Sequence, residues 1–268
     1  MRYFIDLAYR GAPFHGWQIQ PGDVSVQGTL EQALGVLLRQ PVPVVGAGRT
    51  DAGVNARLMV AHVDLPDGFD PCAGTFLRSL NSLTGPDIAI FSFRPVAPDA
   101  HARFDATERE YRYFVHTRKD PFAGGLSWQA PADFDFEAMN RAGSLLLGRR
   151  DFSSFAKLHT DVKTNICHIK HARWVQVGPD YWRFEITADR FLRNMVRAIV
   201  GTLLDVGRGR LDLEGFRKVI TEENRCRAGE SVPAHGLSLV DVAYDDVLGD
   251  AREMGSTEST AAAAMSNL

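Results

Sequence analysis

One glycine-rich run, GAGRTDAGVNA at residues 46–56, carries a single arginine and a single aspartate among its glycines. Glycine permits positive φ and a close approach of the backbone to a ligand, and a carboxylate there can act as nucleophile, general base or stabiliser of positive charge. Arg49 lies two residues before Asp51, on the same side of an extended backbone, where it can bind a phosphate or pair with a carboxylate. A turn capped by Asp51 fits the same residues. A phosphate-binding loop does not, because such a loop opens a helix and a strand-like alternation follows here.

A second stretch, HARFDATEREYRYF at residues 101–114, interleaves basic and aromatic residues. Guanidinium groups bind phosphates and aromatic rings stack on unpaired bases, so this composition suits RNA recognition. Arg103, Arg109 and Tyr111 are the candidate contacts that it supplies. A half-buried strand with a charged outer face has the same pattern.

Arginines recur in a third stretch, RFLRNMVRAIVG at residues 190–201. Arg190, Arg193 and Arg197 follow the spacing i, i+3, i+7, which predicts one stripe on a helix whose apolar residues face the core. Such a stripe is typical of a solvated helix face. If it borders the cleft that holds Asp51, it adds positive charge there.

The elements that must position these residues can be predicted from hydrophobic periodicity, which gives a β-α-β-β-α-β order in the first half of the chain. The expected strands cover residues 2–9, 41–48, 57–65 and 87–96, and the expected helices cover residues 25–41 and 70–80. This order is the ferredoxin-like unit, an antiparallel sheet with two helices on one face. The run with Asp51 joins its two middle strands.

The second half is predicted to repeat this order with insertions. Strands are expected at residues 106–118, in a hairpin at 165–189 and at 236–246, and helices at 134–148, 190–210 and 213–221. The last residues, from 249 to 268, are small, polar and aperiodic, so we expect a disordered tail.

Composition indicates a globular protein: the chain has 268 residues, of which 45% are hydrophobic, enough to bury a core. The net charge is −3, but acidic residues are concentrated after residue 240, so residues 1–240 carry a slight excess of positive charge. No stretch approaches the roughly 20 apolar residues of a membrane span and the N-terminus lacks a signal peptide, so the cytoplasm is the expected compartment. Three dispersed cysteines indicate neither a disulfide framework nor a metal site.

Five motifs in order resemble the tRNA pseudouridine synthase A family, which isomerises uridines in the anticodon stem-loop of tRNA, at positions 38–40. The resemblance spans residues 1–245. The motifs are YRGAPFHGWQIQ with VQGTLEQAL, GAGRTDAGVNA, HARFDATEREYRYF, FLRNMVRAIVGTLLDVGRGR and RAGESVPAHGLSLVDVAY.

The resemblance implies roles for particular residues. Asp51 matches the catalytic aspartate and nucleophile of the family, Tyr111 matches the tyrosine that stacks on the target base, and Arg49 and Arg197 match two arginines flanking the aspartate. We expect Asp51, Tyr111 and Arg197 to be catalytic. The residues expected to bind the substrate are Arg49, Arg103, Arg109, Arg193 and Tyr111. Asn55 stands where the family usually has histidine, which raises a question about loop packing or RNA contact.

The resemblance also implies the architecture: an α+β fold of two ferredoxin-like halves, residues 1–105 and 106–248, with a continuous antiparallel sheet, helices on one face and a basic central cleft. It further implies a homodimer in which one tRNA contacts both subunits, and the use of no cofactor and no metal.

Pseudouridine formation breaks the N1–C1′ bond, rotates the uracil and rejoins it through C5, so it needs no redox partner. The target base must first leave its stack. Asp51 could attack C1′, attack C6 or act by a glycal route, and the residues do not choose among these. Two rivals are a non-catalytic RNA-binding module on the same fold and a small-molecule lyase or hydrolase. A carboxylate repels phosphates at the centre of a basic cleft, which favours the enzyme over the module.

Overall fold

The structure is a computed structural model that describes residues 1–130, 134–157 and 164–245. The predicted tail at residues 249–268 therefore lies outside the described residues. The first half contains six main elements, which follow the predicted order. They are β1 (Arg2–Tyr9), α1 (Val26–Leu38), β2 (Val44–Gly46), β3 (Asn55–Asp64), α2 (Phe76–Thr84) and β4 (Ile88–Pro95).

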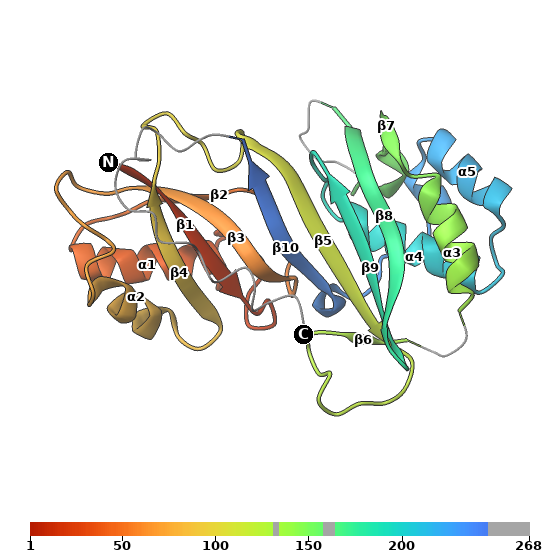
Figure 1. Ribbon diagram of the computed structural model, residues 1–268, viewed down its shortest axis with the longest axis horizontal. Helices are drawn as coiled ribbons and strands as arrows, with labels where there is room; N and C mark the ends of the chain where they lie inside the picture. Colours follow the sequence, from red (N-terminus) through yellow and green to blue (C-terminus); the bar gives the residue numbers. More distant parts are fainter. Residues whose placement is uncertain (131–133, 158–163, 246–268) are drawn as a thin grey trace.

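The second half follows the predicted order with two short extra strands, β6 and β7. Its elements are β5 (Ala106–His116), β6 (Trp128–Gln129), α3 (Phe136–Ser144), β7 (Gly148–Asp151), β8 (Ile166–Gly178), β9 (Tyr181–Ala188), α4 (Met195–Gly207), α5 (Leu213–Thr221) and β10 (Leu237–Tyr244). Hydrogen bonding unites the ten strands of the described residues in one sheet (Figure 1).

The two halves of the sheet have the same strand order. Neighbouring strands run β4-β1-β3-β2 in the first half and β10-β5-β9-β8 in the second, and every neighbour pair in these two sets is antiparallel. The halves meet where β3 pairs with β10, and this junction is parallel, with Asn55 opposite Ser238 and Ala56 opposite Leu239. The predicted α+β class with one large, mostly antiparallel sheet is confirmed. The boundaries of the two domains remain a prediction.

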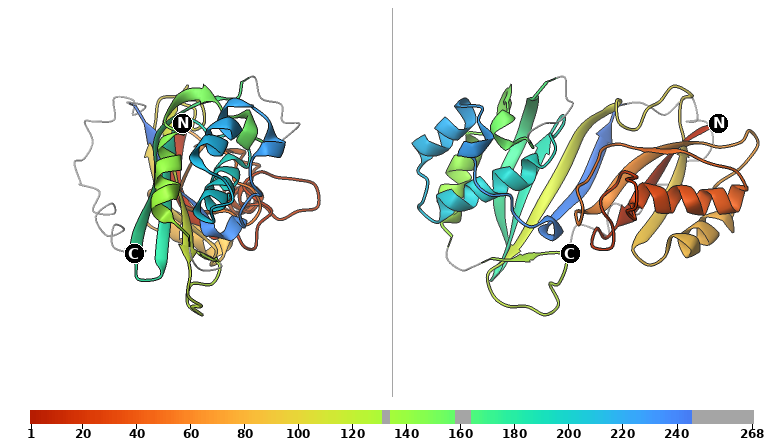
Figure 2. Two further views of the ribbon diagram at one scale, coloured as in Figure 1. Left: turned by 90° about the vertical axis from the view of Figure 1, so that its right-hand side faces the viewer. Right: turned by 180° about the vertical axis from the view of Figure 1, so that it is seen from behind.

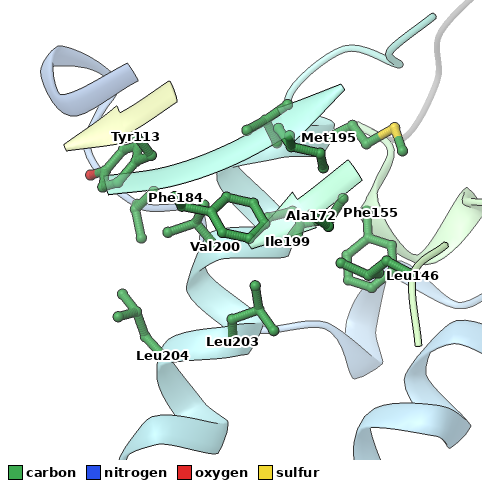
Figure 3. Packing of buried hydrophobic residues seen from close by; sticks show 14 of the residues in the cluster. Tyr113, Leu146, Phe155, Ala172, Phe184, Met195, Ile199, Val200, Leu203 and Leu204 are labelled. Carbon is green, nitrogen blue, oxygen red and sulfur yellow. The ribbon is translucent and has the colours of Figure 1, made fainter. Parts of the chain in front are cut away.

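Helices of both halves lie on the same face of the sheet. Viewed from behind, α1 and α4 stand in front of the strands (Figure 2). Each half has its own cluster of buried side chains, and Tyr111 packs against both. Figure 3 shows Ile199 and Val200 of α4 next to Phe184 of β9, and all three are fully buried. Burial of such a side chain contributes about 1.5–3 kcal/mol, so α4 is anchored firmly.

Capping explains where the helices begin and end. Ser25 caps α1, because its Oγ accepts a hydrogen bond from the Gly28 N–H at 3.2 Å. This helix ends at Leu38, because the next residue, Arg39, adopts the left-handed conformation with φ of 55°, two residues before the proline expected to stop the helix. The helix predicted from Asp70 begins only at Phe76, after a series of turns.

The start of α4 differs from the prediction in a way that matters for the arginines. Asn194 is left-handed, with φ of 66°, and the helix begins at Met195 rather than Arg190. Because Arg190 and Arg193 precede the helix, the predicted arginine stripe on one helix face is wrong. Among the described residues, no helix is long and apolar enough to cross a membrane.

Candidate active site

The loop that carries Asp51 is clamped by the segment after β1. The Tyr9 hydroxyl lies 2.8 Å from Thr50 Oγ1, and the Trp17 N–H donates to the Thr50 carbonyl at 3.2 Å. Gly11 passes so close that a Cβ there would lie 2.2 Å from the Val54 carbonyl oxygen. Only glycine fits this approach, so the clamp holds the loop on both sides of Asp51.

The glycines of the loop serve different purposes. A Cβ on Gly46 would lie 2.5 Å from the Trp17 ring, and Gly53 has a positive φ of 77°, so internal packing and turn geometry account for both. A Cβ added at Gly48, by contrast, would have no neighbouring atom within 4 Å. Gly48 is therefore the glycine of this loop whose backbone a ligand can approach closely.

Asp51 lies between two arginines, Arg193 just before α4 and Arg197 in its first turn. Its Oδ1 is 3.6 Å from Arg193 Nε, and its Oδ2 is 3.6 Å from Arg197 Nη1. Both distances exceed those of a direct hydrogen bond. Each carboxylate oxygen is therefore close to a positive charge and can still bind a third group. The Asp51 side chain is 25% exposed, Arg197 22% and Arg193 58%. The carboxylate is thus partly shielded from water yet reachable.

Hydrogen bonds to the segment before β10 orient this end of α4. Arg197 Nε donates to the Val232 carbonyl at 2.8 Å, and Asn194 Nδ2 donates to Ser231 Oγ at 2.6 Å. The left-handed Asn194 turns the chain sharply between Arg193 and Arg197. As a result, one arginine approaches each oxygen of Asp51.

Tyr111 lies on β5, between β10 and β9, opposite Leu239 and Ile186. Its ring meets the Phe191 ring edge-on, with centroids 5.2 Å apart and an angle of 86°. Its hydroxyl makes no hydrogen bond to any described residue. Burial raises the pKa of Tyr111 to about 12, and the Asp51 carboxylate adds to the rise while Arg109 opposes it. Tyr111 is therefore a neutral phenol at physiological pH.

The second tyrosine of the strand, Tyr113, is a core residue. It is fully buried, and its hydroxyl donates to the Pro233 carbonyl at 3.0 Å. Of the two tyrosines on this face, only Tyr111 has a hydroxyl that is not hydrogen-bonded within the described chain.

Two of the predicted RNA-binding arginines point to solvent. Arg49 is exposed and makes no ion pair or hydrogen bond with the described residues, so the second cation at Asp51 is Arg193 rather than Arg49. Arg103 is exposed as well, with its guanidinium 5.8 Å from the centre of the Phe104 ring.

Known proteins resemble this chain over most of its length. The tRNA pseudouridine synthase A of Parabacteroides distasonis is 59% identical over 248 residues, which cover 92% of this chain and 97% of that protein. This chain belongs to the tRNA pseudouridine synthase A family. The enzymes of the same name from Bacteroides thetaiotaomicron and Bacillus subtilis are 57% and 38% identical, covering 91% and 92% of this chain and 91% and 100% of theirs.

The family profile described as tRNA pseudouridine synthase matches residues 142–245. This synthase is therefore an isomerase that acts on tRNA. Among solved structures, an H/ACA ribonucleoprotein bound to a substrate RNA containing 2′-deoxyuridine gives a TM-score of 0.39 at 10% identity, covering 76% of this chain and 44% of that one.

Asn55 of the synthase is a packing residue, which answers the question raised by the missing histidine. It is 3% exposed, its Oδ1 accepts from the Gly11 N–H at 2.8 Å, and its Nδ2 donates to the His235 carbonyl at 2.8 Å. The side chain therefore joins the clamp to the segment before β10. The sequence pointed to this position only through its departure from the family pattern.

Arg109 does not have the surroundings expected of a phosphate ligand. Its two terminal nitrogens donate to four backbone carbonyls, and nothing in its sequence neighbourhood signals this. Among the described residues, no cluster of three or more histidine, cysteine, aspartate or glutamate side chains could hold a metal ion. A surface cavity of about 250 Å³ lies elsewhere in the second half, lined by Ser144, Leu145, Arg150, Arg217, Ile220 and Thr221.

Proposed function

We propose that this synthase isomerises uridines 38–40 in the anticodon stem-loop of tRNA, with Asp51 as the nucleophile and Tyr111 stacked on the flipped base. The observation that carries the proposal is the placement of the Asp51 carboxylate between Arg193 and Arg197, at 3.6 Å from each. Two cations at this distance stabilise negative charge on the carboxylate, and a carboxylate oxygen is a nucleophile towards a carbon centre.

The reaction needs little besides positioning and charge. The N1–C1′ bond breaks, the C5–C1′ bond forms, the C5 proton goes to solvent and N1 gains a proton. Asp51 supplies the anion that adds to the nucleotide, and the bond it forms breaks again before the product leaves, which restores the carboxylate. Arg197, held by the Val232 carbonyl, keeps that anion in place. The neutral Tyr111 hydroxyl can donate or accept a proton next to the base.

The exposed arginines fit a role in holding RNA. Arg49 and Arg103 are exposed, and Arg193 is more than half exposed although it faces Asp51. We assign their outer N–H groups to the phosphates that flank the extruded nucleotide, because a phosphate binds a guanidinium with charge-assisted hydrogen bonds.

The proposed site of modification can be tested with two tRNA transcripts, both labelled with tritium at uridine C5. One is a natural sequence, and the other has cytidine in place of the uridines at positions 38–40. Release of tritium from the first transcript alone supports the proposal. Equal release from both would show that the synthase modifies uridines elsewhere in tRNA.

We further propose that the synthase acts in the cytoplasm as a homodimer that binds one tRNA across both subunits. Light scattering of the free protein should give twice the mass of the chain. A mixture of Asp51→Asn subunits with subunits carrying Arg103→Glu should recover activity if each tRNA contacts both subunits. A monomeric mass, or no recovery in the mixed dimer, would contradict this.

A further inference from the structure

Arg109 links the three segments that present the site. Its Nη1 donates to the Ala106 carbonyl at 2.6 Å and to the Asp189 carbonyl at 2.9 Å. Its Nη2 donates to the Arg103 carbonyl at 2.7 Å and to the Ala47 carbonyl at 3.1 Å. Four carbonyls from three segments of the chain therefore converge on one planar group.

Each of these contacts lies close in sequence to a residue of the site. Ala47 precedes Asp51 by four residues, in the same loop. Asp189 follows β9 and precedes Arg193 by four residues. Ala106 begins β5, and Arg109 itself stands two residues before Tyr111, on the same face of the strand. The aspartate, the arginines and the tyrosine thus share one anchor.

The Arg109 guanidinium is held by the dipoles of these four carbonyls. Among the described residues, no carboxylate forms an ion pair with it. Burial lowers the pKa of Arg109, but a guanidinium remains charged at physiological pH. A half-buried charge without a counterion costs stability, so stability alone is a poor explanation for it. Four of its five N–H groups are already used, which leaves no pair of donors for bidentate binding of a phosphate.

We propose that Arg109 is a positioning residue for catalysis, which sets the Asp51 loop and the start of α4 against the strand that carries Tyr111. The proposal replaces the expected role of Arg109 as an RNA ligand, and it rests on the proposed roles of Asp51 and Tyr111. A misplacement of about 1 Å at a reacting centre can cost on the order of 100-fold in rate.

The test compares Arg109→Gln and Arg109→Lys with the wild type in single-turnover tritium release at saturating tRNA. The dissociation constant for tRNA is measured over a range of salt concentrations, and thermal melting reports the folded fraction. Arg112→Gln is the matched control, because Arg112 lies on the same strand, faces the other way and pairs with Glu110 at 2.7 Å.

For Arg109→Gln we expect the rate per folded molecule to fall by about 10- to 100-fold, with tRNA affinity within about threefold and an unchanged salt slope. Lysine keeps the charge but offers a single nitrogen, so Arg109→Lys should fall between glutamine and the wild type. Arg112→Gln should stay within about twofold of the wild-type rate. If Arg109→Gln does not melt cooperatively, Arg109→Lys decides by the same measurements.

Two results would overturn the inference. A wild-type rate in Arg109→Gln would show that Arg109 does not position the site. If only Arg109→Lys folds, a wild-type rate in that variant would show the same. Weaker tRNA binding with a salt slope reduced by about one would make Arg109 a phosphate ligand after all. Asp51→Asn is assayed alongside: if it retains turnover, the proposed function itself has failed, whatever Arg109 does.

Discussion

At Tyr111 the ring and the hydroxyl have different surroundings, so each can be tested alone. The ring packs against both hydrophobic clusters and against Phe191, whereas the hydroxyl makes no hydrogen bond within the described chain. We predict that Tyr111→Phe keeps thermal stability and tRNA affinity but lowers the single-turnover rate by about 100-fold, the contribution of a general acid or base. An unchanged rate would remove the hydroxyl from the mechanism.

Tyr113→Phe is the matched control for this substitution. It removes a hydroxyl that donates to the Pro233 carbonyl, so it should lower the free energy of unfolding by about 0.5–1.5 kcal/mol and leave the rate per folded molecule unchanged. A loss of rate in this variant alone would mean that the wrong tyrosine had been chosen.

Single residues explain what the sequence could and could not predict about the site. On the residues alone Asp51 fits a capped turn as well as a catalytic site, and the resemblance to the synthase family singles it out. Arg197 was expected beside it, whereas Arg193, expected only to bind the substrate, lies where Arg49 was expected. Asn55 packs through a partner 180 positions away in the chain, and two of the four carbonyl contacts of Arg109 come from residues 62 and 80 positions away. Local patterns contain no information about such contacts.

At the scale of elements, the orientation of α4 depends on its contact with the segment before β10. A Cβ on Gly201 would lie 1.7 Å from the Glu230 carbonyl oxygen, so at this point the backbone of the helix lies directly against the backbone of the segment. We predict that Gly201→Ala lowers the free energy of unfolding by about 1–3 kcal/mol, as overpacking does. It should also slow turnover, because Arg197 depends on the same segment through Val232.

Gly35→Ala on α1 is the matched control for that helix. Its Cβ would meet only the Gln40 carbonyl, at an ordinary 3.5 Å, so the change should raise the free energy of unfolding by about 0.5–1 kcal/mol. Chemical denaturation measures both variants. A stable, fully active Gly201→Ala protein would show that α4 tolerates a shift from this segment.

The boundaries of elements were predicted less well than their order. Periodicity extended α4 back to Arg190, because residues 190–194 share the helical spacing of residues 195–207. The left-handed Asn194 and its hydrogen bond to Ser231 interrupt the helix, and that bond comes from a segment 37 residues away. The interruption is also what lets Arg193 and Arg197 approach different oxygens of Asp51.

At the scale of the whole molecule, the connection between β4 and β5 is tied to both halves by hydrogen bonds. The His62 Nδ1 accepts from the Ala102 N–H at 3.1 Å, the Tyr244 hydroxyl donates to the Ala102 carbonyl, and Arg2 donates to the Ala100 carbonyl. Burial, together with the charges of Arg2 and His101, lowers the pKa of His62 to about 4, although Asp64 and Asp105 oppose the shift. Its neutral ring is therefore part of the folded structure.

This lowered pKa predicts the direction of a pH effect. Because the folded protein binds the proton on His62 more weakly than the unfolded chain, His62 favours folding fully above pH 6.5 and loses this contribution as the pH falls towards 4. The loss is on the order of 2–3 kcal/mol. Urea unfolding at several pH values measures it, and His62→Gln should flatten the curve in this window. An equally steep curve in the variant would assign the effect to other groups.

The repeated strand order was predictable because each half has the same sequence of elements, even though no sequence repeat is evident. The parallel junction between β3 and β10 was not, since it joins residues more than 180 positions apart. Strand signals are local, and they do not say which edges will meet. That junction places the Asp51 loop of one half beside the Tyr111 strand, Arg193 and Arg197 of the other.

The most direct measurement of the central claim is single-turnover tritium release by Asp51→Asn, with tRNA affinity measured on the same preparation. Asp23→Asn, which changes a carboxylate that faces His15, is the control. We predict that Asp51→Asn binds tRNA within about threefold of the wild type and loses activity by about 1,000-fold or more, while Asp23→Asn does neither. A rate for Asp51→Asn within about tenfold of the wild type would contradict the assignment of Asp51 as the nucleophile.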